Sequence, residues 1–389
     1  MFFFPCFSQA ASCIQRNIVM STTEELLALS REATRPIASP TLLSCATAVP
    51  PQRFSQEEAF ALSGYTSPRI RQIFLNCNIE YRHLWLDPEE FVPRESPDQL
   101  HARYLEGACR LASSAARLAL EQAGLSASEV DCILVASCTG YLCPDLSTLL
   151  VSELALRSDV QRGALLGHGC AGALPLLQRA SDFARANPAR HVLAVAVEVC
   201  SACYYFDTSM ETVIGNAICA DGAAAFVLSC DPDNHSPRSV SASFLPPRVI
   251  AFQSVLDPSN LEKVGFEHRD GKLRIVLAAE IRELAGPLID RCLHALLAPR
   301  GLRREDIRFW ILHPGGRKVL DAASQFLGLE EKHLGFSRRV LRNYGNMSSP
   351  TVLFVLDDVL RNGSPRPGDF GVLLALGPGF AAEAALLRW

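Results

Sequence analysis

The stretch "AGLSASEVDCILVAS" at residues 123–137 decides the fold, because a similar stretch, "RGLRREDIRFWILHP", recurs at residues 300–314. In each copy a Gly-Leu pair ends a helical pattern, and an acidic residue followed by Val or Ile leads into an apolar strand. The starting positions, 123 and 300, give an offset of 177 residues. This repeat predicts two similar α/β halves, each with a parallel-rich sheet and helices between the strands.

The same offset relates two residues whose side chains can carry chemistry. Cys170 stands in "LLGHGCAGALP", and adding the offset to its number gives 347, one residue beyond Asn346 in "RNYGNMSSP". Each follows a glycine and precedes an apolar helical pattern, and each half then closes with an apolar strand, at 221–229 and at 370–379. We therefore predict that Cys170 and Asn346 lie at equivalent helix N-termini. The alternative is that all α/β segments share such features, but the matching order favours duplication.

The two predicted halves span residues 21–233 and 234–389, with the join in the polar, Pro-rich stretch "CDPDNHSPRS" (230–239). Residues 1–20 are predicted to be a disordered tail or a segment that is not part of the native protein. Their apolar start is superficially like a signal peptide, but it has no basic region and Pro5 interrupts it. We therefore expect a cytoplasmic protein rather than a secreted one.

Composition and charge argue against several classes of function. The chain has 389 residues, 49% of them hydrophobic, and a net charge of −4 without a run of Lys and Arg, so a nucleic-acid partner is not expected. No stretch of about 18 apolar residues is present, so no membrane span is expected. Most of the 14 cysteines lie in apolar or small-residue segments, which indicates free thiols in a reducing compartment rather than disulfides.

Three side chains on Gly-rich turns supply the parts for covalent thioester chemistry: Cys170, His313 in "WILHPGGRKVLD", and Asn346. The thiol can hold an acyl group, the imidazole can keep the thiol ionised, and the imidazole and the amide together can donate hydrogen bonds to an oxyanion. A helix that begins just after Cys170 is expected to lower the pKa of its thiol. Taken singly, each residue has a structural alternative: a buried cysteine, a histidine at a strand end and a helix cap.

These motifs resemble those of the type III polyketide synthases, the chalcone synthase-like family, over essentially the whole chain from about residue 40. "HPGGRKVLD", "YGNMSSP" and the C-terminal "GPGF" are specific in combination. The resemblance implies a thiolase-like αβαβα fold, a homodimer, and repeated condensation of malonyl-CoA onto a CoA-linked starter, with neither a carrier protein nor a further cofactor. It also implies that Cys170 takes the acyl chain, that His313 pairs with its thiolate, and that His313 and Asn346 hold the enolate oxygen left by decarboxylation.

The resemblance further implies which residues surround the reacting groups. The implied cavity residues are Cys138, Thr139, Cys143, Glu198, Cys200, Cys203, Cys219, Ile275, Ser348, Gly377 and Pro378. Plant members commonly have Thr at the positions of Cys200 and Cys203 and a gatekeeper Phe at that of Cys219, so three thiols imply a roomier pocket. A small residue at Cys203 resembles bacterial members that admit a long acyl chain through a side tunnel. We therefore expect a fatty acyl-CoA starter and an alkylpyrone or alkylresorcinol product; the alternative is that these thiols are only small packing residues.

For the CoA moiety the resemblance implies Lys318, Arg69 and Arg71, because phosphates prefer such cations. A solvated surface position is the alternative for Lys318. The loop "TGYLCPD" (139–145) matches the segment of the family that reaches across the dimer, so Cys143 is expected near the cavity of the partner.

A metal site and three rival functions fit the sequence less well than this interpretation does. Beyond Cys200 and Cys203 no zinc-ligand spacing is present, and one such pair is weak evidence for a metal. A ketoacyl-ACP synthase III would share the thiol, imidazole and amide, but the "NMSSP" and "HPGGRK" settings argue against it. A papain-like hydrolase would carry an aromatic residue directly after the thiol, where this chain has Ala171. A non-catalytic acyl-binding scaffold would not need all three reactive groups.

Overall fold

The computed structural model describes residues 39–230 and 245–389. The predicted N-terminal segment 1–20 lies outside these residues, as does the predicted join at 230–239 except for its first residue. Within the described ranges, no helix combines the length and the apolar character that a membrane crossing requires. The cysteines of this part of the chain are all free, as predicted.

The first half of the chain forms five strands of the main sheet and most of the helices that flank it. Its strands are β1 (Thr41–Ala48), β4 (Val130–Ser137), β5 (Gln161–Leu166), β6 (His191–Val199) and β7 (Asp221–Ser229). Its helices are α2 (Gln56–Leu62), α3 (Pro68–Leu75), α4 (Pro97–Ala123), α5 (Leu146–Glu153), α6 (Ala173–Ala186) and α7 (Met210–Ile218). A short separate ribbon pairs β2 (Arg53–Ser55) with β3 (Tyr81–His83).

The second half repeats this plan with one strand fewer in the sheet. Its strands are β8 (Arg248–Leu256), β11 (Ile307–Leu312), β12 (Phe370–Gly377) and β13 (Ala381–Arg388), and a separate hairpin joins β9 (Val264–Arg269) to β10 (Lys272–Leu277). Its helices are α8 (Ile281–Leu297), α9 (Arg317–Leu327), α10 (Glu331–Tyr344) and α11 (Thr351–Asn362).

Strand pairing confirms the predicted duplication and corrects two of its details. The sheet order is β11-β12-β13-β8-β1-β7-β6-β4-β5, so the halves meet where β8 adjoins β1 through the single pair Thr41 and Arg248. In the first half β4 pairs parallel with β6, and β6, β7 and β1 then pair antiparallel. In the second half β11, β12, β13 and β8 follow the same pattern.

The sheet is therefore mixed, and the expectation of a parallel-rich sheet in each half was wrong. The prediction that the 370–379 stretch closes the second half was also wrong, since β12 is the counterpart of β6 and β13 closes that half as β7 closes the first. β12 and β13 are both apolar, and only their pairing shows that β12 is an inner strand and β13 the closing one.

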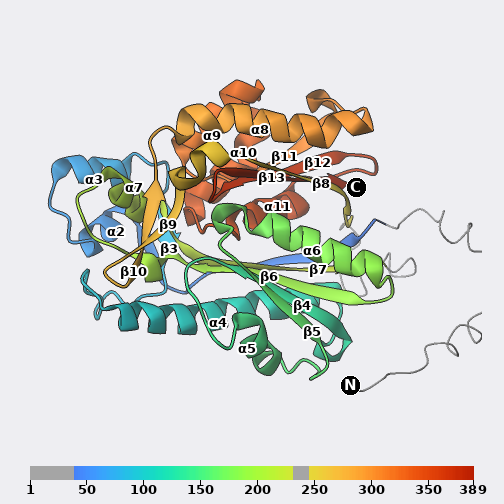
Figure 1. Ribbon diagram of the computed structural model, residues 1–389, viewed down its shortest axis with the longest axis horizontal. Helices are drawn as coiled ribbons and strands as arrows, with labels where there is room; N and C mark the ends of the chain where they lie inside the picture. The colour runs from blue at the N-terminus through green and yellow to red at the C-terminus, as the bar shows by residue number, and fades with distance from the viewer. Residues whose placement is uncertain (1–38, 231–244) are drawn as a thin grey trace, which may run out of the picture. The chain divides into compact units, whose positions relative to one another are not determined.

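Two helices, α6 and α11, lie between the two halves of the sheet and contact strands of both halves. α6 contacts β6 and β7 of the first half and β12 and β13 of the second, and α11 contacts strands of both halves in the same way. Figure 1 shows this central layer, with α4 and α5 on the outer face of one half and α8 on the outer face of the other. The result is the predicted thiolase-like αβαβα arrangement.

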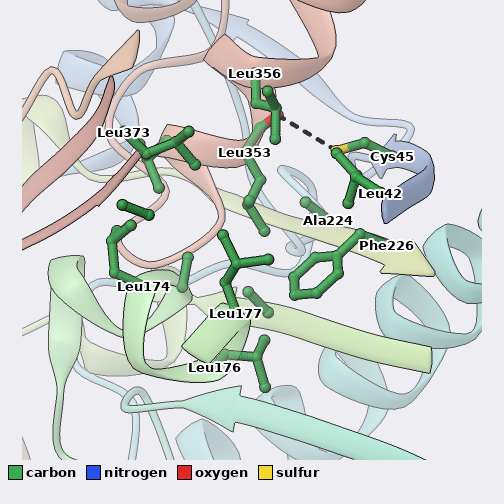
Figure 2. Close-up of a cluster of buried hydrophobic side chains, with 14 of the residues drawn as sticks. Leu42, Cys45, Leu174, Leu176, Leu177, Ala224, Phe226, Leu353, Leu356 and Leu373 are labelled. Carbon is green, nitrogen blue, oxygen red and sulfur yellow. Dashed lines mark hydrogen bonds between the residues drawn. The ribbon is translucent and has the colours of Figure 1, made fainter. Parts of the chain in front are cut away.

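The apolar contacts of this central layer are shown in Figure 2. Leu174 and Leu177 of α6 lie beside Leu353 of α11, and all three side chains are almost fully buried. Strand residues such as Phe226 complete the cluster. Because burying a leucine contributes about 1.5–3 kcal/mol, the cluster holds α6 and α11 firmly against each other. α6 begins three residues after Cys170 and α11 begins five residues after Asn346.

Candidate active site

Cys170 lies on a short 3-10 turn, Gly169–Ala171, between the end of β5 and the start of α6. Gly169 adopts a left-handed conformation (φ +48°), and a Cβ there would lie 2.4 Å from Cδ of Pro378. A Cβ on Gly377 would in turn lie 2.6 Å from the carbonyl oxygen of His168. The "GHGC" turn and the C-terminal "GPG" turn therefore pack directly on each other, and this contact requires glycine at both positions.

Asn346 is held by its backbone and by its side-chain oxygen. Its N–H donates to the carbonyl of Ile218 (2.8 Å), and its carbonyl accepts from the N–H of Ala220 (2.9 Å). The side-chain Oδ1 accepts from the N–H of Ser348 (2.8 Å), while Nδ2 donates to the carbonyl of Gly315 (3.2 Å). An amide nitrogen carries two hydrogens, so these contacts orient the amide, and the second N–H of Asn346 is directed toward the Cys170 sulfur in the cavity.

His313 follows β11, where its backbone N–H donates to the carbonyl of Leu374 (2.8 Å). Both ring nitrogens are buried and have no hydrogen-bond partner. Burial lowers the pKa of His313 to about 4, so the imidazole is neutral near pH 7. Buried ring nitrogens are normally hydrogen-bonded in a folded protein, so the imidazole of His313 is able to bind a polar group inside the cavity.

The pKa of Cys170 differs from the expectation drawn from the sequence. Burial raises the pKa of its thiol to about 12, although hydrogen bonds from the side chains of Ser348 and Asn346 oppose this shift. The prediction that the following helix lowers this pKa was wrong for the free protein, because the loss of water around the sulfur outweighs the helix dipole. The thiol and the imidazole are therefore both neutral, and the imidazole is available as the base that takes the thiol proton.

The three predicted reacting residues lie on the wall of one cavity. The free volume of this cavity is about 110 Å³, and part of the cavity is open to solvent. Five of the other predicted residues also lie on its wall: Cys200, Cys219, Ile275, Ser348 and Pro378.

An apolar extension of this cavity, here called the acyl arm, was not found in the sequence. It is enclosed by the β9–β10 hairpin, α8 and α9. Its wall residues are Phe266, Val276, Leu277, Ile281, Ile289, Val319, Leu320, Ala323 and Leu327. The helical spacing of those on α9 predicts a buried face, but spacing does not distinguish a face that packs from one that lines a cavity.

The remaining predicted cavity residues lie elsewhere. Cys138 and Thr139 line a separate hollow together with Tyr104 and Tyr141, and Cys143 is exposed. The Cys203 thiol is buried and donates to the carbonyl of Thr139 (3.3 Å), so the predicted side tunnel at Cys203 is not part of the main cavity. Gly377 packs against the turn that carries Cys170 and does not line the cavity. Glu198 is fully buried and does not line the cavity either.

Glu198 joins the two halves from this buried position. Its carboxylate accepts from the N–H and the hydroxyl of Thr139 (3.1 and 2.9 Å), from the N–H of Cys138 (2.9 Å) and from the hydroxyl of Ser349 (2.6 Å). Burial raises the pKa of Glu198, and these hydrogen bonds counteract that rise. The loop after β4 is thereby tied to the start of α11. Ser349, next to the predicted Ser348, was missed in the sequence.

A basic groove leads into the cavity. Arg69 and Lys318, both predicted to bind CoA, lie on its wall with Arg282 and Arg317, which were not predicted. The groove and the cavity share wall residues Ile218, Leu277, Ile281, Gly315 and Val319. Arg71, also predicted to bind CoA, lies outside the groove, and its guanidinium makes two 2.9 Å contacts with Glu57.

The basic groove has a net positive charge. Among the described residues, Arg69, Arg282, Arg317 and Lys318 have no carboxylate partner, and Glu211 is the acidic residue on the same wall. Nε of Arg317 is buried without a hydrogen-bond acceptor. A groove of this charge suits an anionic ligand such as a phosphate.

A duplicated thiolase-like fold with a cysteine, a histidine and an asparagine on one cavity defines the class of acyl-transferring condensing enzymes. Comparison with known families is more specific. The N-terminal domain of the chalcone and stilbene synthases matches residues 94–232, and the C-terminal domain of the same family matches residues 249–389. The chain therefore belongs to the chalcone and stilbene synthase family, and it is a type III polyketide synthase that condenses malonyl-CoA units.

Individual relatives agree with this assignment. The chain is 32% identical to 3,5-dihydroxyphenylacetyl-CoA synthase of Streptomyces toyocaensis, over 90% of each chain. It is 34% identical to 1,3,6,8-tetrahydroxynaphthalene synthase of Streptomyces peucetius subsp. caesius, over 88% of this chain and 91% of the relative. Among solved structures, PKS-I of the brown alga Ectocarpus siliculosus superposes with a TM-score of 0.83 at 28% identity, covering 91% of this chain and 99% of the other.

The depressed pKa of His313 predicts how stability depends on pH. Between pH 6.5 and about 4 the unfolded chain protonates this histidine and the folded protein does not, so its contribution to stability is present above pH 6.5 and is lost as the pH falls. The His313→Gln variant should therefore lose less unfolding free energy than the wild type over this interval, by up to about 3 kcal/mol. Urea denaturation at several pH values measures this difference. The exposed His268→Gln variant is the matched control, and equal slopes for all three proteins would contradict the prediction.

Proposed function

We propose that Cys170, His313 and Asn346 form the active site and that the enzyme extends an aliphatic, long-chain acyl starter, giving an alkylpyrone or alkylresorcinol. The observation that carries this proposal is that the three side chains share one cavity, and that this cavity continues as the apolar acyl arm. The chemistry needs no group beyond these side chains and the CoA thioesters.

In the loading step His313 takes the proton of the Cys170 thiol, and the thiolate attacks the thioester carbonyl of the starter. The C–S bond to CoA breaks, and the CoA thiolate takes the proton from the imidazolium. Because burial disfavours both ionised side chains before substrate binds, the ion pair forms only when the thioester is in place. The cysteine is thereby protected from reaction in the free enzyme.

In the extension step malonyl-CoA loses CO2, and the electrons of the broken C–C bond form an enolate. One N–H of Asn346 and the N–H of the neutral His313 imidazole bind the enolate oxygen. The enolate carbon attacks the acyl group on Cys170, and the Cys170 thiolate leaves. The fixed amide of Asn346 supports this role, since a donor held in place needs no reorganisation when the charge develops.

The acyl arm supports an aliphatic starter. The arm follows α9 from Val319 to Leu327, eight residues that rise about 12 Å along the helix. Such a length of apolar wall is not needed for a short polar acyl group, and it removes a hydrocarbon chain from water at about 0.8 kcal/mol per CH2. The names of the relatives denote aromatic products, so the arm is the feature from which we infer a different starter.

The basic groove supports binding of the CoA nucleotide at the mouth of the cavity. Lys318 and Arg69 lie on its two sides, and Gly315 and Val319 belong to the walls of both the groove and the cavity. A thioester whose phosphates occupy the groove can therefore reach Cys170 with its acyl end. Arg282 and Arg317 add to the same positive field.

The open edge of the sheet supports a homodimer. β5 is the last strand of the sheet. Leu166 at its end is 52% exposed, and Tyr141 in the loop after β4 is 68% exposed. An edge strand with one unpaired side and exposed apolar side chains is typical of a surface that a second chain covers. Cys143 lies in the same exposed loop, as expected for a residue that reaches the partner.

Substitution of Cys170 tests the proposed chemistry. In Cys170→Ala no acyl-enzyme should be detected by mass spectrometry, and in Cys170→Gln malonyl-CoA should still be decarboxylated. Adding Asn346→Ala to Cys170→Gln should lower this residual decarboxylation about 10²–10³-fold, because one oxyanion donor is lost. An acyl adduct on Cys170→Ala would exclude Cys170 as the nucleophile, and unchanged decarboxylation in the double variant would exclude Asn346 as a donor.

Filling the acyl arm tests the proposed starter. Ala323→Phe should lower kcat/KM for the longest starters about tenfold or more and leave short starters less affected. A series from acetyl-CoA to stearoyl-CoA, with products measured by mass spectrometry, gives the profile. The control is Ala322→Phe, one residue along α9 and not on the cavity wall. Identical profiles for Ala323→Phe and the wild type would place the acyl chain outside the arm.

The basic groove provides a test with an internal control. Arg69→Met and Lys318→Met should each raise KM for acyl-CoA about two- to fivefold, the effect of losing about 0.4–1 kcal/mol of charge interaction at an accessible site. Arg71→Met should not, since Arg71 pairs with Glu57 away from the groove. N-acetylcysteamine thioesters, which lack the nucleotide, should give the same KM with every variant. A KM that rises equally for both kinds of thioester would contradict phosphate binding by these residues.

A further inference from the structure

Two cavity thiols besides Cys170 lie together at the ends of neighbouring strands. β6 and β7 pair antiparallel, and their last register pair joins Val199 to Asp221. The chain continues from β6 directly into Cys200, and Cys219 comes two residues before Asp221. Both sulfurs lie on the wall of the main cavity. The sheet register therefore brings the backbones near the two cysteines close together, and both side chains line the same cavity.

The two thiols also interact unequally. A hydrogen bond from the Cys200 thiol lowers the pKa of Cys219, and the same contact together with burial raises the pKa of Cys200. Cys219 is thus the thiol that ionises and Cys200 the one that stays protonated. This asymmetry is that of a nucleophilic thiol beside a resolving thiol.

A buried guanidinium accounts for part of the asymmetry. Arg82 is 1% exposed, and its Nη1 donates to the carbonyls of Cys219 (2.6 Å) and Asn216 (2.7 Å). Among the described residues no carboxylate pairs with Arg82, and its Nε has no acceptor. The positive charge beside Cys219 lowers the pKa of that thiol and favours its thiolate.

We propose that Cys200 and Cys219 form a dithiol modification site in the cavity wall, which hydrogen peroxide oxidises to a disulfide. The Cys219 thiolate attacks the peroxide O–O bond and becomes a sulfenic acid, and the other oxygen leaves as hydroxide, which takes a proton to form water. The Cys200 thiol then attacks the sulfenic sulfur, the S–O bond breaks, and a second water forms. The two sulfurs lose two electrons and two protons in all, and one peroxide is reduced.

The disulfide would act on the cavity without involving Cys170. Cys219 is bridged to Asn346 through its backbone, since the N–H of Asn346 donates to Ile218 and the N–H of Ala220 donates to the carbonyl of Asn346. A bond from Cys219 to Cys200 therefore fixes the wall on which Asn346 depends. The same pair of thiols is a binding site for trivalent arsenicals, which bridge two neighbouring sulfurs.

The experiment uses Cys170→Ala protein, so that the proposed nucleophile cannot contribute and the outcome does not depend on the proposed function. The reduced protein is treated with hydrogen peroxide, its free thiols are counted by alkylation, and it is digested without reductant. We expect the loss of two thiols, a linked peptide that contains Cys200 and Cys219, and full reversal by dithiothreitol. Absence of the linked peptide, or irreversible oxidation of Cys219 to a sulfinic acid instead, would overturn the proposal.

Matched variants in the same background test the assignment of each sulfur. Cys200→Ser should leave Cys219 as a sulfenic acid that a dimedone probe traps, and Cys219→Ser should leave Cys200 reduced. Cys203→Ser, in the same 3-10 turn but with its thiol directed to the carbonyl of Thr139, should form the disulfide as before. Phenylarsine oxide offers a measurement that needs no oxidation. The Cys170→Ala protein should bind one equivalent of phenylarsine oxide, and the Cys170→Ala/Cys219→Ser protein should bind none. Binding of an equivalent by the double variant would contradict the proposed site.

Discussion

The packing of α6 against α11 is the contact on which the rest of the structure depends. The described parts of β1 and β8 meet at one register pair, Thr41 and Arg248, flanked by two backbone hydrogen bonds, so the sheet itself holds the two halves together weakly. The apolar cluster around Leu174, Leu177 and Leu353 instead joins them through the central helices. Because Cys170 and Asn346 each precede one of these helices, the same packing that stabilises the fold brings the thiol and the amide to one cavity.

Within that cavity, burial decides the charges of the reacting groups. The thiol of Cys170 and the imidazole of His313 are both driven to their neutral forms, and the ring nitrogens of His313 have no hydrogen-bond partner among the described residues. The free enzyme thus keeps a reactive pair in an unreactive state. The groove outside has the opposite character, with four cations and solvent access. A CoA thioester matches this division, since its charge lies at one end and its reacting carbon at the other.

Much of the fold and the centre of the site could be predicted from the sequence, because both depend on local patterns. The repeat between 123–137 and 300–314 places α6 and α11 as equivalents, and the Gly-rich turns identify Cys170, His313 and Asn346. What could not be predicted depends on contacts between distant segments. The side chain of Arg71 turns to Glu57 while Arg69 lies on the wall of the groove, and their positions two residues apart in the sequence do not reveal this. Likewise, Ala323 and Leu327 have the spacing of a packed helix face, and only the tertiary structure shows that a cavity lies beside them.

The acyl arm and the nucleophile belong to different stretches of the chain. The arm is built by the β9–β10 hairpin, α8 and α9, all between residues 264 and 327, whereas Cys170 comes from the first half. The walls of the arm and the nucleophile are therefore encoded separately, whereas His313 lies inside the segment that builds the arm. Insertions or exchanges confined to the β9–β10 hairpin and α8 can alter the shape of the arm while Cys170, His313 and Asn346 stay in place. Such modularity offers a physical route by which enzymes of one family diverge in their products, and it makes the hairpin with α8 a natural unit to transplant between them.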